Sequence, residues 1–376
     1  MDTPPPTRAH TPKRHVAVWA QVLAVPVVLA LLLAATGWWM LSTTAGLRAA
    51  AAIAPLLVPG LAISGVDGTA REGVHAASLV IRRERWSLRV DDLLIILRHG
   101  SIRARELDLE SFSARRVAID WVPGDPGAAG PDFIGAPLDV LVRQGSITEL
   151  ALGARDAAPY TFRSVELAGR INDRIIDVER VMGEYERTRI DAHGQIAATP
   201  PFATTLDARF ATAVKDRAVT ARADAHGSLE RLQVSISADD SAARAHVEAT
   251  LRLFGPVPLE ALEARVETLD PSLWLTDVPH MLLGASASLK PTPHANGSWG
   301  VAGPFAVENV APGPIDRDRV PLRSARGTLA WDSDTLTLDV VRAEAPHGSA
   351  QGRLVWSTAR GVSVQAQVSG IDASTL

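Results

Sequence analysis

Apolar and polar residues alternate along most of the chain after Gly60, and this period of two limits the possible fold more than any other feature of the sequence. In the segment VSVQAQVS, residues 362–369, valine or alanine takes every second position, with serine or glutamine between. Successive side chains of a β-strand point to opposite faces, so this segment predicts a strand with one apolar and one polar face. Many such segments follow one another, separated by Gly, Pro, Asp or Asn, and predict a mainly β protein.

The apolar faces of these strands must be covered by something. A second sheet, a layer of helices or an apolar ligand would serve, and helical periodicity is scarce after Gly60. This leaves two sheets packed together or one curled, repetitive antiparallel sheet with a hydrophobic interior. In the curled sheet, the residues predicted to line the groove are Leu232, Val234, Ile236, Val247, Ala249, Leu251, Leu253, Leu329, Trp331, Leu336, Leu338, Val340, Val362, Val364, Ala366 and Val368.

Weak internal repeats favour an elongated stack over a set of compact domains. VETLDPSLW at 266–274 recurs in outline as VSGIDASTL at 368–376. We expect an N-terminal β segment at 61–122, a Gly- and Pro-rich linker at 123–137 and a repetitive β-groove segment at 138–376. The pattern stops without a terminal helix or polar tail, so we expect the last segment to be truncated.

Residues 16–41 carry no charge and are long enough to cross the hydrocarbon layer of a membrane, which needs about 20 apolar residues. They predict a transmembrane helix, although a cleaved signal peptide is the alternative. Its tryptophans suit the membrane interface, and the basic residues of the 1–15 tail favour a cytoplasmic amino end. The tryptophans are Trp19, which follows Val18, and Trp38 and Trp39, and the basic residues are Arg8, Lys13 and Arg14.

The alanine-rich stretch at 42–60 predicts a short helix that ends near Pro59 and Gly60. Two placements remain open for it. The helix lies either at the membrane–water interface or as a lid on the domain that follows.

No residue pattern typical of catalysis or metal binding is present. The sequence has no cysteine, no Walker loop and no G-x-S-x-G or H-E-x-x-H motif, and its net charge of -4 implies no nucleic-acid partner. Asp91 and Asp92, like Asp239 and Asp240, are adjacent in predicted strands, so we expect each pair to point to opposite faces. The sequence therefore predicts no enzyme, no catalytic residue, no metal and no cofactor.

Three stretches carry a resemblance to a known family. They are TTAGLRAAAAIAPLLVPGLAISGVDGTAREGVHAASLVI (43–81), WSLRVDDLLIILRHGSIRARELDLESFSARRVAIDW (86–121) and FGPVPLEALEARVETLDPSLW (254–274). Together with the preceding apolar stretch, they resemble the TamB family of the AsmA-like group, the inner-membrane subunit of the translocation and assembly module. Members of this family are longer and end in a C-terminal domain that this sequence lacks, so the chain resembles an N-terminal portion.

The resemblance implies a taco-like β-sheet in the periplasm, held by a single-pass helix in the inner membrane with the N-terminus in the cytoplasm. It implies a role in moving phospholipid between the inner and outer membranes, and an outer-membrane barrel partner of the TamA type. The expected function is a phospholipid conduit. The alternative is an assembly scaffold for insertion or secretion of outer-membrane proteins with that barrel partner.

Overall fold

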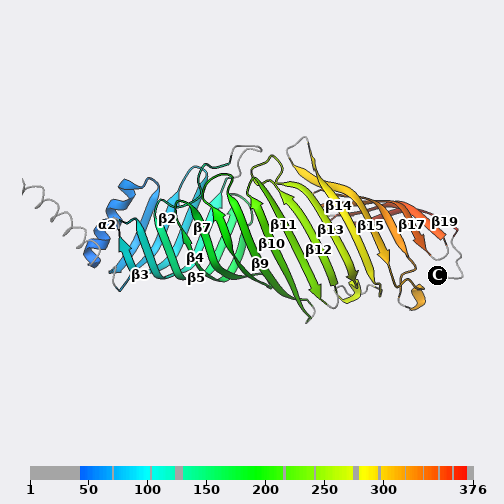
Figure 1. Ribbon diagram of the computed structural model, residues 1–376, viewed down its shortest axis with the longest axis horizontal. Helices are drawn as coiled ribbons and strands as arrows, with labels where there is room; N and C mark the ends of the chain where they lie inside the picture. The colour runs from blue at the N-terminus through cyan, green and yellow to red at the C-terminus, as the bar shows by residue number, and fades with distance from the viewer. Residues whose placement is uncertain are drawn as a thin grey trace, which may run out of the picture.

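In the part of the chain that the structure describes, the protein is mainly β and consists of one long curled sheet with one α-helix at its end (Figure 1). The computed structural model describes residues 43–370, except for 70–71, 102–103, 123–129, 215–216, 241–242, 274–278, 295–297, 318, 333, 346–347 and 358–359. The helix is α2 (Thr44–Leu57), and two 3-10 turns, η1 (Pro271–Leu273) and η2 (Ile315–Arg317), lie in loops. The strands are β1 (Leu61–Thr69), β2 (Gly73–Arg82), β3 (Trp86–Ser101), β4 (Glu106–Trp121), β5 (Asp139–Ala154), β6 (Tyr160–Ile171), β7 (Ile175–Tyr185), β8 (Thr188–Ala197), β9 (Ala203–Val214), β10 (Arg217–Ser228), β11 (Arg231–Asp240), β12 (Ala243–Leu251), β13 (Leu259–Leu269), β14 (Leu283–Pro293), β15 (Trp299–Asn309), β16 (Ser324–Asp332), β17 (Thr335–Ala345), β18 (Gly348–Ser357) and β19 (Gly361–Ser369).

Each strand pairs with the next one in the sequence, so the order along the chain is also the order along the molecule (Figure 1). All of these pairs are antiparallel except β4 and β5, which run parallel. The expectation of a wholly antiparallel sheet is wrong at this point. A parallel pair needs a long connection because the chain must return to the other end of the sheet, and residues 122–138 provide it.

Helix α2 covers the free edge of β1, at the left end of Figure 1. The Thr43 side chain accepts a hydrogen bond from the Gly46 N–H at 3.0 Å and thereby caps the start of the helix. Thr44 Oγ1 donates to the Gly68 carbonyl at 3.0 Å, and Arg48 Nε donates to the Val66 carbonyl at 3.1 Å. These bonds satisfy carbonyls of an edge strand, which would otherwise invite pairing with another chain.

The predicted transmembrane helix at 16–41 lies outside the described residues, as do its tryptophans and the basic residues of the N-terminal tail. Within the described part of the chain, no helix has both the length and the apolar character required to cross a bilayer. Helix α2 lies in the stretch where the alanine run predicts a helix.

A line of positions where the alternation of faces is interrupted crosses strands β1–β6. We call this line the crease. In each of these strands, two consecutive residues point to the outer face. In β4, for example, Arg115 and Arg116 are exposed between the buried residues Ala114 and Val117. The pairs lie beside one another across the sheet, at positions 64–65, 77–78, 91–92, 115–116, 148–149 and 163–164.

Left-handed backbone conformations occur at the crease in three of the six strands, β1, β3 and β6. The φ angles are 65° at Gly65, 59° at Asp92 and 50° at Ser164. One such residue shifts the alternation by one position, so the apolar residues on both sides of the crease point inward. Asp91 and Asp92 consequently share the outer face, where Asp91 contacts Ser78 and Asp92 contacts His75. The expectation that these carboxylates point to opposite faces is wrong.

The sheet folds along the crease, so its two limbs pack against each other. One buried cluster joins residues from both limbs, among them Val90 and Val117 on one side and Leu93 and Ile147 on the other. Each of these four side chains is at most 6% exposed. The interior of β1–β6 is therefore filled by the protein's own side chains.

Candidate functional site

The inner face of β10–β19, which we call the open groove, is the candidate site. Residues paired across strands share a face, so the register shows which side chains lie together. A central row crosses all ten strands and contains only apolar residues or glycine: Ala223, Ile236, Val247, Ala264, Ala287, Phe305, Gly327, Val340, Gly352 and Ala366. A parallel alanine row is made of Ala221, Ala238, Ala245, Val266, Ala285, Val307, Ala325, Ala343, Ala350 and Val368.

The structure brings together on this face all but one of the residues predicted to line a groove. The exception is Leu253, which lies in the turn after β12 and not in a strand. Leu232 is on the correct face but is only 6% exposed, so it is packed against its neighbours and does not line open space. The prediction missed other inner-face residues, namely Leu262, Leu289, Phe305 and Leu354. In the strands of these residues, alanine and glycine also occupy inner-face positions, and such small residues weaken the apolar periodicity of the sequence.

Side chains in the open groove remain accessible, in contrast to those of β1–β6. Ile236, in a strand paired on both sides, is 39% exposed although it points to the inner face; Val364 and Val368 are 62% and 54% exposed, but they lie in β19, which among the described residues is paired on one side only and is exposed along its whole length. Leu329 and Leu338 are half-buried. The groove is not open throughout, because Leu232, Leu259 and Leu289 on the same face are 6%, 8% and 8% exposed, but among the described residues no buried cluster like that around Leu93 extends along β15–β19.

Packed aromatic residues mark the place where the groove begins. Phe202, which follows β8, is 1% exposed, and its ring meets that of Phe254 edge-on at 5.7 Å. The second half of the connection between β4 and β5 packs here, since the Ile134 N–H donates to the Ala198 carbonyl at 3.0 Å. A Cβ at Gly130 would meet the Phe254 ring at 2.9 Å. This contact closes one side of the groove at the ends of β8–β12.

The outer face carries the polar and charged residues. Between the parallel strands, the Arg143 guanidinium donates two hydrogen bonds of 2.9 Å to the Asp108 carboxylate, and these hydrogen bonds lower the pKa of Asp108. A shallow hollow of about 740 Å³ lies over β12–β16, lined by residues such as Arg265, Ser286 and Glu263. Both signs of charge surround it, so nothing in it selects an anionic or a cationic ligand.

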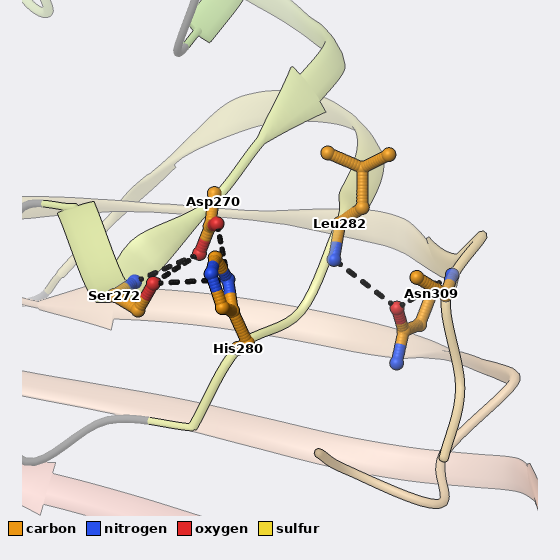
Figure 2. Close-up of polar contacts among 6 residues, drawn as sticks. Asp270, Ser272, His280, Leu282 and Asn309 are labelled. Atoms are coloured by element: carbon orange, nitrogen blue, oxygen red, sulfur yellow. Dashed lines mark hydrogen bonds and ion pairs between the residues drawn. The ribbon is translucent and has the colours of Figure 1, made fainter. Parts of the chain in front are cut away.

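A Ser, an Asp and a His meet in the loop after β13, a cluster that the sequence pattern did not reveal (Figure 2). Asp270 Oδ1 accepts hydrogen bonds from the Ser272 backbone N–H at 3.1 Å and from its hydroxyl at 2.6 Å. His280 Nδ1 lies 2.5 Å from Asp270 Oδ2 and 3.2 Å from Ser272 Oγ.

This arrangement does not match a catalytic triad. In a triad, the serine and the carboxylate contact different nitrogens of the imidazole, and the serine proton points to the histidine. Here both groups contact Nδ1, and the hydroxyl of Ser272 is directed to Asp270. Asp270 caps η1, and on the neighbouring loop Asn309 accepts a hydrogen bond from the Leu282 N–H at 3.3 Å. The cluster and Asn309 thus hold loops in place at one end of the strands (Figure 2).

Comparison with known proteins yields no match: no family model, no curated protein and no solved structure matches this chain. The resemblance to the TamB family therefore stays a prediction.

Proposed function

We propose that the protein conducts phospholipid, with the acyl chains lying in the open groove and no covalent chemistry involved. One observation carries the proposal: the central row is apolar across ten consecutive strands, yet none of its residues is fully buried, and Ile236 and Ala366 are exposed. At about 4.8 Å between strands, this surface is on the order of 40 Å long. It is long enough to contact an acyl chain in several successive positions.

The energetics favour such a path. An acyl chain of roughly fifteen methylenes left in water would cost on the order of 12 kcal/mol, at about 0.8 kcal/mol per methylene. Contact with valine, leucine and alanine side chains removes most of this cost, and the open side of the sheet leaves the headgroup in water. The proposal includes the predicted anchor at 16–41 in the inner membrane, a periplasmic sheet and a barrel partner of the TamA type in the outer membrane.

A pairwise crosslinking experiment tests the proposal. A photoreactive amino acid replaces Val234, Leu338 or Val364 on the inner face, and its matched controls are the outer-face neighbours Gln233, Thr337 and Gln365. After irradiation in cells, phospholipid should be attached at the three inner positions and at least about tenfold less at the three outer ones. Equal labelling of both sets would refute a one-sided groove.

The same experiment separates the conduit from the assembly scaffold. A scaffold that docks other proteins through its strand edges predicts crosslinks to protein along β19, which is exposed along its whole length, and no lipid at the inner positions. A complementary variant is Leu338→Arg, paired with Thr337→Arg. The first places a charge in the groove and should abolish lipid crosslinking at Val364, whereas the second should leave it unchanged.

A further inference from the structure

Three tryptophans line one rim of the open groove. Trp299, Trp331 and Trp356 lie in β15, β16 and β18 and are 37%, 55% and 40% exposed. Trp331 pairs with Leu336, which in turn pairs with Trp356, so these two indoles face the same side two strands apart. On the other side of β16, Trp331 pairs with Val301 of β15. Trp299 is two residues from Val301 in the same strand, so it shares the face of Trp331. We call these three residues the tryptophan rim.

The opposite rim of the same strands is different. It is formed by the alanine row, which here consists of Ala325, Ala343, Ala350 and Val368. In the described part of β15–β19, no aromatic side chain lies at that end of the strands. The two sides of the groove therefore offer a ligand different chemistry.

Indole is suited to the boundary between acyl chains and headgroups, because its ring is apolar and its N–H donates a hydrogen bond. None of the three indole N–H groups has a hydrogen-bond partner among the described residues. The ester carbonyls and phosphate oxygens of a phospholipid are acceptors that would satisfy them. Arg360 is exposed in the turn between β18 and β19, at the same end of the strands as Trp356, and adds a positive charge for the phosphate.

We infer that a phospholipid in the open groove lies along the strands, with its headgroup at the tryptophan rim and its acyl chains directed toward the alanine row at the other end of the same strands. This inference rests on the proposed function and goes further, since it gives the bound lipid one orientation. The headgroup then leaves the groove over the ends of β15–β18 at the tryptophan rim.

Fluorescence quenching by brominated phosphatidylcholine tests this orientation, because bromine quenches indole only at short range. One lipid carries bromine near the ester end of its acyl chains and the other near the methyl end. Each is added to the purified full-length chain with the background substitutions W19F/W38F/W39F, because lipid around the predicted anchor would also quench these three tryptophans. With the lipid brominated near the ester, quenching should be about twofold stronger, as expected for an indole at headgroup level. The difference should vanish in the triple variant W299F/W331F/W356F.

Trp86 and Trp121 provide a matched control. They are 40% and 41% exposed, similar to the tryptophan rim, but lie in the filled part of the sheet. The variant W86F/W121F should keep the full difference between the two lipids.

Two results would overturn the inference, and they are distinguishable. If both lipids quench but the methyl-end bromine is equally or more effective, or if the difference persists in the triple variant, the lipid binds in another orientation. If neither lipid quenches and no phospholipid copurifies with the chain, the proposed function itself fails, and the inference fails with it.

Discussion

Two isoleucines on the inner face allow a direct measurement of how far the interior is filled. Ile147 in β5 is 6% exposed within the buried cluster, and Ile236 in β11 is 39% exposed in the open groove. Both lie in strands that are paired on both sides, so neither substitution is made at a free sheet edge. The difference between the two variants therefore reports mainly how tightly each side chain is packed.

The expected costs follow from the burial of each side chain. Removing three carbon atoms from Ile147 loses about 2.4 kcal/mol of transfer free energy and leaves a closed cavity, for a total of about 4 kcal/mol. At Ile236 the transfer loss is about 1.5 kcal/mol, because part of the side chain is already in water. No cavity penalty is added there, since water can enter the space.

Hydrogen–deuterium exchange measures the local free energy of opening in each strand. In lipid-free protein, Ile147→Ala should speed amide exchange in β5 by roughly a thousandfold, and Ile236→Ala should speed exchange in β11 by about tenfold. Ser235→Ala, on the outer face of β11, is the control and should change exchange by less than Ile236→Ala does. Equal effects of the two isoleucine variants would refute the distinction between a filled and an open interior.

Three further predictions concern the crease, the parallel strand pair and the closed side of the groove. Ser164→Gly should raise the free energy of unfolding by about 1 kcal/mol, because glycine adopts a φ of 50° without steric cost, whereas Ser164→Val should lower it; thermal unfolding that ranks the two in reverse order would contradict the role of this backbone angle. The hydrogen bonds from Arg143 lower the pKa of Asp108 in the folded protein, so the stability they contribute is present above the ordinary pKa of 3.8 and is lost as the pH falls below it. Asp108→Asn should remove this part of the acid sensitivity. The measurement is the shift of the urea midpoint between neutral and acidic buffer. Phe202→Ala should cost about 3–5 kcal/mol in urea unfolding, and a loss below about 1 kcal/mol would mean that its contact with Phe254 does not close the groove in solution.

The faces of the later strands could be predicted from the sequence because a strict period of two survives there. In β11 and β12, and again in β16–β19, every strand residue predicted to line a groove lies on the inner face. Leu253 failed because the strand ends before it, at Leu251. Periodicity tells which side a residue faces but contains no signal for where pairing stops.

The crease could not be predicted in the same way. At Asp92 and Ser164 an ordinary residue adopts a left-handed conformation, and no local sequence preference requires it at serine. The exposed pair at Arg115 and Arg116 could be noticed as a break in the alternation, but a break is equally typical of a turn. The parallel pairing of β4 and β5 depends on the path of the connection between them, which is a tertiary property.

The reach of the side chains explains why one part of the sheet is filled and the other open. Two sheet surfaces pack about 10 Å apart, and leucine, isoleucine and valine side chains from both surfaces fill that distance. In β1–β6 the crease brings two such surfaces together, and the cluster around Leu93 and Ile147 results. In β10–β19 the alanine row, as at Ala221, Ala245 and Ala285, has single methyl groups that cannot span the gap even if the sheet curls, although leucines of neighbouring rows such as Leu232 are packed. An apolar surface that its own side chains cannot cover must be covered by water, at a cost of about 25 cal/mol per Å², or by an apolar molecule that enters from outside.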